Sequence, residues 1–256
     1  MDKLLKQRPV LALTVITFIF VIVLVSIRKI LPLDDNMSLL VSQAIILIPT
    51  IYLLKVRGSL HIFKFDIKSF NRGLLVGWFG IFLAVGFFIY RFDLFLSANL
   101  TLGSILIIII ANLLVGAFEE ILLRGFVFNE LLSNHKPLMA AIISGIIFGV
   151  AHVFNYLKNP PAEVTAQILY AFFLGVFFAA IYYVTKNIWS AILIHGLIDI
   201  SAGLTAGDTS MAQAAAAPDL ASSIGSAVFV VSTVLPALFI GIIIFKRHAK
   251  KQKARV

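Results

Sequence analysis

The stretch SILIIIIANLLVGAFEEILLRGFVF, residues 104–128, decides the class of fold. It is long and apolar enough to cross a bilayer, because about 20 such residues span a hydrocarbon core of ~30 Å. It nevertheless contains Glu119, Glu120 and Arg124. A charged side chain near the membrane centre costs roughly 2.5–3.5 kcal/mol on insertion scales. These three side chains therefore need partners or a chemical task.

The composition of the whole chain is that of a polytopic membrane protein. Of its 256 residues, 61% are hydrophobic and only 13% are charged, and the mean hydropathy is +1.04. A chain of this kind cannot cover itself with an ordinary soluble surface. Eight apolar segments have about the length of a membrane-spanning helix: Val10–Ile27, Ser38–Leu54, Gly73–Tyr90, Ser104–Phe128, Leu138–Tyr156, Val164–Val184, Ile188–Leu204 and Ile224–Phe245. We therefore expect an all-α bundle of about eight transmembrane helices, forming a single domain over residues 1–256.

The basic residues predict the orientation of the bundle, because cytoplasmic loops are enriched in Lys and Arg. With eight spans, sixteen of the 21 Lys and Arg residues fall on one side and Arg124 lies inside a span. The other side receives Arg28, Lys29, Arg91 and Lys158. This predicts that both termini are cytoplasmic. The net charge of +9 then reflects topology and attraction to anionic lipid, and we do not infer nucleic-acid binding from it.

The N-terminal run and two of the connections between spans also have features that predict their structure. The first apolar run is too long for a signal peptide and lacks a small-residue cleavage site, so we expect a retained helix. Lys55–Arg72 alternates basic and apolar residues, which is typical of a segment lying on the membrane surface. Thr205–Ser223 is small and polar, which predicts an external loop. The chain has no cysteine, so any metal must be held by His, Asp or Glu.

Helical geometry separates the two glutamates. Glu120 and Arg124 are four residues apart, with the acid first, so they can pair along one helix face. Glu119 lies about 100° away around the same helix, so another helix must supply its neighbours. Desolvation raises the pKa of a carboxyl group in general, which is the condition for a general base working near neutral pH. Simple neutralisation by protonation is the alternative role.

Two further segments carry histidines. Gly145 and Gly149 form a small-residue face one turn below His152, and such a face lets another helix approach closely. His195 and Asp199 are four residues apart, so the carboxylate can accept a hydrogen bond from the ring and fix its orientation. Taken alone, each histidine could simply join helices. Together with the unpaired glutamate they could line one polar pocket.

Depth along the spans argues against straight, upright helices. Glu119 lies about midway through its segment, His152 near the external end of its own, and His195 near a cytoplasmic end. If the three side chains lie at the same depth in the membrane, tilted helices, helices of unequal length or a broken helix must bring them there.

The three motifs resemble those of a known family, the CPBP intramembrane proteases. That family contains CAAX-processing endopeptidases of the type called Rce1 and bacterial Abi proteins linked to bacteriocin maturation and self-immunity. Its EExxxR, FxxxH and HxxxN/D motifs are matched in order by Glu119-Glu120-Ile-Leu-Leu-Arg124, Phe148-Gly-Val-Ala-His152 and His195-Gly-Leu-Ile-Asp199. They fall within residues 104–204, the expected protease core. The last position departs from the Asn that is typical of the prenyl-protein proteases.

The resemblance implies an intramembrane endopeptidase, of metallo or glutamate type, that acts on a membrane-associated protein or peptide precursor. It implies that Glu119 activates a water and that His152 and His195 hold the water or a metal and stabilise the oxyanion. Asp199 would orient the second histidine, and the ion pair of the first motif would brace the site. The expected partners are the substrate and the lipid of a bacterial cytoplasmic membrane.

A metal and two other functions stay open at this stage. Glu119, His152 and His195 could hold a divalent metal such as zinc with an open position, but the chain lacks an HExxH motif. A non-catalytic bacteriocin immunity or partner-binding protein is one alternative, and the intact motifs argue against it. An ion-coupled transporter would bury the same residue types but would show repeated halves, and the sequence shows none.

Overall fold

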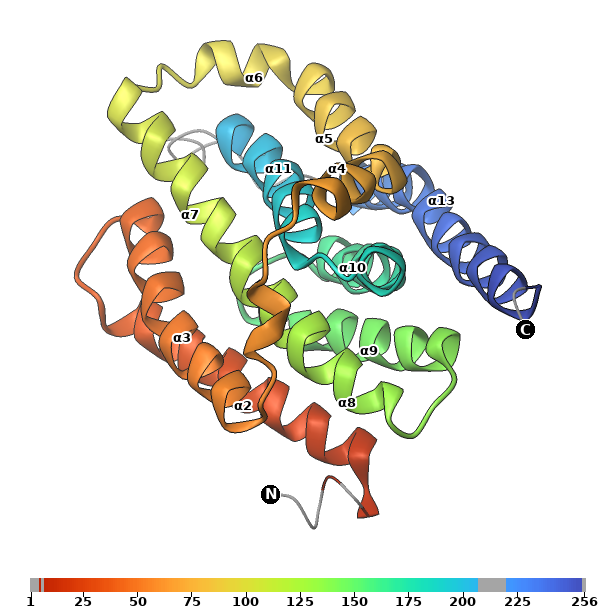
Figure 1. Cartoon of the computed structure of the whole chain (residues 1–256). Coiled ribbons are helices and arrows are strands. Elements are labelled where there is room, and N and C mark those ends of the chain that lie inside the picture. Colours follow the sequence, from red (N-terminus) through yellow and green to blue (C-terminus); the bar gives the residue numbers. More distant parts are fainter. Residues whose placement is uncertain (1–4, 6, 207–219, 255–256) are drawn as a thin grey trace.

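The computed structural model describes residues 5, 7–206 and 220–254, and over these residues it is helical, with no strand. Most of the expected external loop at 205–223 lies outside the described residues, and its last part, from Leu220, is already helical. The elements, shown in Figure 1, are α2 (Pro9–Ile30), α3 (Asp35–Val56), η1 (Leu60–Phe63), α4 (Ile67–Val76), α5 (Trp78–Tyr90), α6 (Phe92–Ser97), α7 (Leu102–Glu120), η2 (Ile121–Phe128), α8 (Asn129–Leu132), α9 (Pro137–Ala151), η3 (His152–Leu157), α10 (Pro161–Thr185), α11 (Ile188–Ala206) and α13 (Leu220–Lys253). Here η1 and η3 are 3₁₀ helices and η2 is a π-helix.

The expected helical membrane bundle is confirmed, with a smaller number of full-length spans. By length and composition, the described residues contain six stretches able to cross a membrane: Pro9–Ile30, Asp35–Val56, Leu102–Leu132, Pro137–Leu157, Pro161–Thr185 and Leu220–Lys253. A seventh is formed if α4 and α5 count as one span, although they are bent by 62° relative to one another. The segment expected as the remaining span, Ile188–Leu204, is a shorter apolar helix. The cytoplasmic placement of the termini stays a prediction.

The bend between α4 and α5 falls at Gly77, where α11 packs against the chain. A Cβ atom at Gly77 would collide with the side chain of Ile194. Asp66 begins α4 by accepting a hydrogen bond from the backbone N–H of Ser69 (2.8 Å), and this bond lowers the pKa of the Asp66 carboxyl. The cap marks where α4 begins, and the contact with Ile194 lies at the point where α4 and α5 divide what hydropathy alone reads as one helix.

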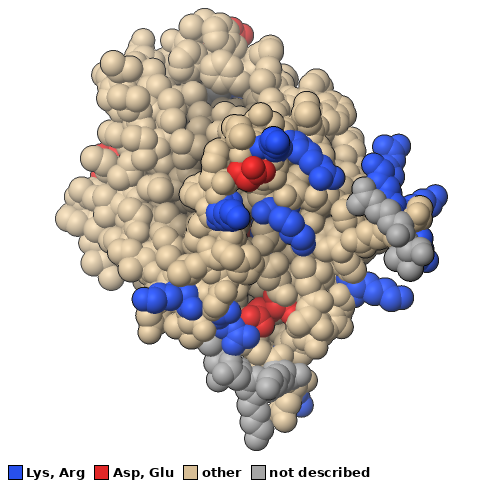
Figure 2. Space-filling model, viewed as in Figure 1, with Lys and Arg blue, Asp and Glu red and all other residues tan. Residues whose placement is uncertain are grey.

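The segments assigned to one side of the membrane contact one another. Arg57, after α3, forms a bidentate ion pair with Glu130 of α8, with Nε–Oε1 and Nη2–Oε2 distances of 2.8 and 3.0 Å. The indole N–H of Trp189 donates to the carbonyl of Phe63 at 3.0 Å. On the face drawn in Figure 2, Lys and Arg are spread over the centre, the right and the lower part, and the upper left is a broad surface with almost no charge. A broad uncharged surface is what contact with lipid requires.

Helix α10 occupies the middle of the bundle, and it is the most buried of the candidate spans. It packs against α9 and α13, while α7 packs against α11 (Figure 1). Glycines allow α9 and α10 to approach closely. A Cβ at Gly175 would lie 2.8 Å from the Cα of Gly145, and one at Gly149 would meet the carbonyl oxygen of Ile168 at 2.5 Å. The small-residue face expected at Gly145 and Gly149 is therefore confirmed.

The crossing of α7 and α11 determines where the motifs meet. A Cβ at Gly116 would lie 2.9 Å from the backbone nitrogen of Gly196 and 3.0 Å from the carbonyl oxygen of Ile192. Gly116 lies one turn before the glutamate pair, and Gly196 follows His195 directly. Backbone contact at this point brings the first and third motifs into side-chain reach.

Gly116→Ala tests this crossing. The added Cβ would force the α7 and α11 backbones apart, so we expect a loss of about 1–3 kcal/mol in unfolding free energy. Gly86→Ala is the matched control, because a Cβ on this α5 glycine meets nothing within 4 Å. Thermal unfolding in detergent measures both. Equal stability of the two variants would contradict the close crossing.

Candidate active site

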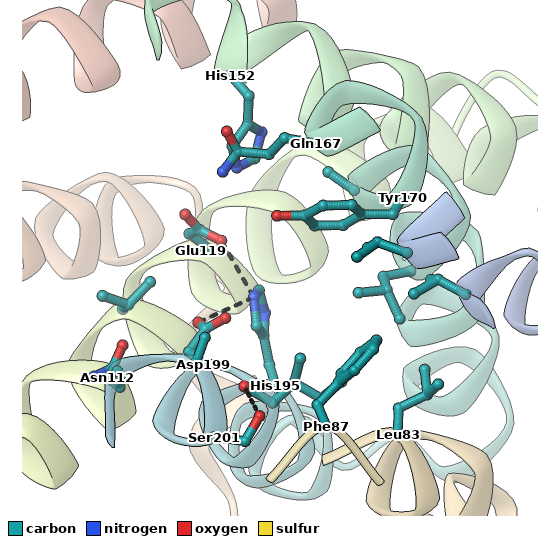
Figure 3. A pocket seen from close by; sticks show the side chains of 18 of the residues that line it. Leu83, Phe87, Asn112, Glu119, His152, Gln167, Tyr170, His195, Asp199 and Ser201 are labelled. Atoms are coloured by element: carbon teal, nitrogen blue, oxygen red, sulfur yellow. Dashed lines mark hydrogen bonds and ion pairs between the residues drawn. The ribbon is translucent and has the colours of Figure 1, made fainter. Parts of the chain in front are cut away.

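The three motifs meet at one cavity of about 530 Å³ (Figure 3). Glu119 comes from α7, His152 from the start of η3, and His195 and Asp199 from α11, and all four line the cavity. Glu120 and Arg124 lie behind its wall. The other lining residues are Leu83, Phe87, Arg91, Asn112, Val115, Phe148, Gln167, Tyr170, Ala171, Leu174, Ile198, Ser201, Ala202, Gly203, Val230 and Val234.

The buried part of the site is a network centred on Glu120. Its Oε1 atom accepts a hydrogen bond from Nδ1 of His195 at 2.8 Å and lies 3.0 Å from Nη1 of Arg124. A second nitrogen of Arg124, Nη2, donates to the carbonyl of Gly175 at 3.0 Å. The side chains of Glu120 and Arg124 are 0% exposed. The network therefore joins α7, η2, α10 and α11, and its two charged members are fully buried.

Aromatic rings enclose this network. The guanidinium carbon of Arg124 lies 5.1 Å from the ring centre of Phe148 and 5.5 Å from that of Phe178. Phe178 also stacks on the His195 ring, with centroids 5.0 Å apart and an angle of 16° between planes. Cations are attracted to aromatic faces, and the effect is larger where water is excluded. The rings thus hold both the cation and the imidazole in place.

On the cavity side, His195 lies beside two carboxylates. Its Nε2 atom is 3.4 Å from Oε2 of Glu119 and 3.5 Å from Oδ2 of Asp199. These carboxylates are 20% and 28% exposed, so both are accessible from the cavity. Helix α11 thus supplies the neighbour that Glu119 needs. The Nδ1 contact, which orients the ring, is made by Glu120, while Asp199 contacts the opposite nitrogen.

His152 lies where α9 ends and the chain tightens into η3. Its Nδ1 atom is 2.9 Å from the carbonyl oxygen of Phe148. A carbonyl only accepts, so Nδ1 carries the hydrogen and Nε2 of the neutral ring is an acceptor. Figure 3 shows the ring pointing toward Glu119. The end of α9 at Ala151 and the shortness of α11 bring together residues that upright helices would leave at different depths.

Five polar residues of the cavity belong to none of the three motifs: Arg91, Asn112, Gln167, Tyr170 and Ser201. The amide of Asn112 donates to the carbonyl of Ile108 in its own helix at 2.8 Å, and Gln167 Oε1 accepts from Asn155 at 2.7 Å. The Tyr170 hydroxyl points toward Glu119 in Figure 3. The available signal was weak: two amides inside apolar spans, and a tyrosine one turn from one of them on α10.

A metal ion needs three or more ligand side chains grouped around one point. Within the described part of the chain, no three His, Asp or Glu side chains are grouped as metal ligands. The Nε2 atom of His195 already faces two carboxylates, and His152 makes its one hydrogen bond away from them. Glu119, His152 and His195 are thus not grouped as metal ligands among the described residues, a bound metal stays a prediction, and no step below is routed through one.

Fold and site together define a polytopic helical membrane protein with buried carboxylates and histidines around an internal cavity. Residues 101–201 match the family model described as Type II CAAX prenyl endopeptidase Rce1-like. The chain is also 32% identical over 90 residues to a Bacillus subtilis (strain 168) protein named "Putative membrane peptidase YdiL". That match covers 35% of this chain and about a third of the relative. The resemblance to the CPBP proteases is thereby confirmed, and the family match contains all three motifs.

Arg124→Met tests the buried network. Removing the guanidinium leaves the Glu120 carboxylate buried without its cation, which costs about 3–5 kcal/mol in comparable ion pairs. The double variant Glu120→Gln, Arg124→Met removes both charges and should lose less than the sum of the two single variants. Denaturation of the four proteins in detergent gives the coupling energy. Strict additivity would show that the two side chains do not depend on each other.

Proposed function

We propose that this protein is an intramembrane endopeptidase in which Glu119 activates a water for attack on a peptide bond. The observation that supports this most is that the two adjacent glutamates have different partners. Glu120 is occupied by Arg124 and His195, whereas the Glu119 carboxylate reaches the cavity beside the same imidazole. The family match over residues 101–201 supports the same class of reaction.

The water is oriented by two acceptors. The Glu119 carboxylate and the Nε2 atom of His152 both accept hydrogen bonds, and Figure 3 shows these side chains facing each other. A water between them gives one hydrogen to each and presents a lone pair to a bound peptide. The water oxygen bonds to the carbonyl carbon, Glu119 takes the proton, and the carbonyl π electrons move to the oxygen.

Collapse of the tetrahedral intermediate completes the reaction. The carbon–nitrogen bond breaks as Glu119 returns its proton to the leaving nitrogen. The products are a new carboxyl end and a new amine, and Glu119 is again a carboxylate. His195, oriented by Glu120, keeps the Glu119 carboxylate in position through both proton transfers.

The cavity wall indicates the type of substrate. Apolar side chains from three helices form one side, namely Leu83, Phe87, Leu174, Val230 and Val234. They favour a substrate with apolar residues near the scissile bond. The B. subtilis relative is a bacterial protein, and we propose a peptide precursor, a leader peptide or a membrane protein in a bacterial cytoplasmic membrane as substrate, in preference to a prenylated chain end.

Glu119→Gln tests the proposed base. Loss of a general base typically costs 10²–10⁴-fold in rate, so we expect cleavage to fall at least about 100-fold with little change in thermal stability. The assay uses the purified protein in liposomes with a randomised peptide library, and mass spectrometry identifies the products. Glu163→Gln, at an exposed position in the first turn of α10, is the matched control and should cleave normally.

Three results would contradict the proposal. Near-wild-type cleavage by the Glu119→Gln protein would remove this carboxylate from the mechanism. A parallel loss of bound metal and activity on elemental analysis would make Glu119 a metal ligand. Failure of the wild-type protein to cleave any peptide would favour an immunity or partner-binding role.

A further inference from the structure

Hydrolysis of a peptide bond places negative charge on the former carbonyl oxygen. Hydrogen-bond donors aimed at that oxygen usually make the largest single contribution to catalysis of such reactions, and losing one costs about 10²–10³-fold in rate. The Glu119 carboxylate, as the proposed base, can only accept hydrogen bonds. A donor elsewhere in the cavity wall therefore adds to the groups that the three motifs supply.

Neither histidine offers a ring N–H directed at open space. The Nδ1–H of His152 donates to the carbonyl of Phe148, which leaves its Nε2 as an acceptor. The Nδ1–H of His195 donates to Glu120, and its Nε2 faces the two cavity carboxylates at 3.4 and 3.5 Å. The Nε2 atom of His195, which the resemblance links to the oxyanion, is thus shared with two carboxylates, and a separate donor in the cavity wall meets no such competition.

Most of the other polar groups of the wall are held by partners of their own. Asn112 donates to the carbonyl of Ile108 in its own helix, and Ser201 donates to that of Ile198 at 2.6 Å. Gln167 is held by Asn155 and extends beside the His152 ring in Figure 3. Arg91 is exposed where α5 ends.

Tyr170 has the placement that an oxyanion donor requires. Its ring packs against both hydrophobic clusters of the core, which fixes the side chain. Its hydroxyl reaches the cavity from α10 and points toward the Glu119 carboxylate (Figure 3). A carbonyl group bound between the two side chains has its carbon next to the water on Glu119 and its oxygen toward the phenol.

We propose that Tyr170 is a catalytic residue whose hydroxyl donates a hydrogen bond to the oxyanion of the tetrahedral intermediate. The inference rests on the proposed peptidase function. The phenol proton stays on Tyr170 throughout, because the hydrogen bond only stabilises the developing charge. When the carbon–nitrogen bond breaks, the oxygen becomes a carbonyl again and the hydrogen bond weakens.

Tyr170→Phe removes the donor and keeps the ring. We expect kcat on a peptide selected from the library to fall about 10²–10³-fold with KM nearly unchanged, because the hydrogen bond strengthens only in the transition state. Tyr182→Phe is the matched control on the same helix. The Tyr182 hydroxyl is bonded to the amide of Asn129 at 3.0 Å and does not line the cavity. This control should keep the wild-type kcat.

The outcomes separate the inference from the function on which it rests. If the wild-type protein cleaves the peptide and Tyr170→Phe has the same kcat, Tyr170 is not the donor and the peptidase proposal stands. An equal fall in kcat in both variants, or a rise in KM alone for Tyr170→Phe, also overturns the catalytic role. If the wild-type protein cleaves nothing, both proposals fail.

Discussion

The buried contact of Glu120 with Arg124 and His195 is the interaction on which the rest of the site depends. One carboxylate oxygen meets the guanidinium at 3.0 Å and the imidazole at 2.8 Å, with no exposure to solvent. An ion removed from water to this extent is stable only when its partner is well placed, and loss of the partner costs several kcal/mol. Because Arg124 also bonds to the Gly175 carbonyl, the network fixes three helices as well as one ring.

This network explains why two neighbouring glutamates can differ in role. The turn between consecutive residues of a helix sends Glu120 into the protein and Glu119 toward the cavity. His195 contacts both, through opposite ring nitrogens. Glu120, on the buried side, sets the orientation of the ring. The oriented ring then contacts the Glu119 carboxylate on the cavity side. The π-helix that follows directly contains Arg124, and such segments often occur at functional sites.

Part of this arrangement could be predicted from the sequence because it depends on local spacing. Hydropathy predicted a helical membrane bundle, the spacing of Glu120 and Arg124 predicted their pairing, and Gly145 and Gly149 predicted a close helix contact. The bend at Gly77 was beyond such reasoning, because it accompanies packing of Ile194 from a distant segment. The end of α9 at Ala151, which allows His152 to reach the cavity, also has no clear local signal.

In the candidate site, too, contacts between distant segments could not be predicted from the sequence. The motif residues could be selected from their chemistry, but sequence spacing assigned the orienting contact of His195 to Asp199, whereas the structure gives it to Glu120. That contact spans two helices and depends on the backbone approach of Gly116 and Gly196. Tyr170 was not selected, since a tyrosine in an apolar helix is usually a packing residue. Its direction becomes visible only when α10 is placed beside α7 and α11.

The most direct test of the account is a single-turnover cleavage of the peptide library in water enriched in ¹⁸O, followed by mass spectrometry of the products and of the protein. If Glu119 acts as a base, the first turnover places one ¹⁸O atom in the new carboxyl end and none in Glu119. If the Glu119 carboxylate attacks the peptide itself, a mixed anhydride forms: water attack on its Glu119 carbonyl leaves the product unlabelled and the label in Glu119, and hydroxylamine traps the anhydride whichever carbonyl the water attacks. That second result would contradict the central claim that Glu119 activates a water.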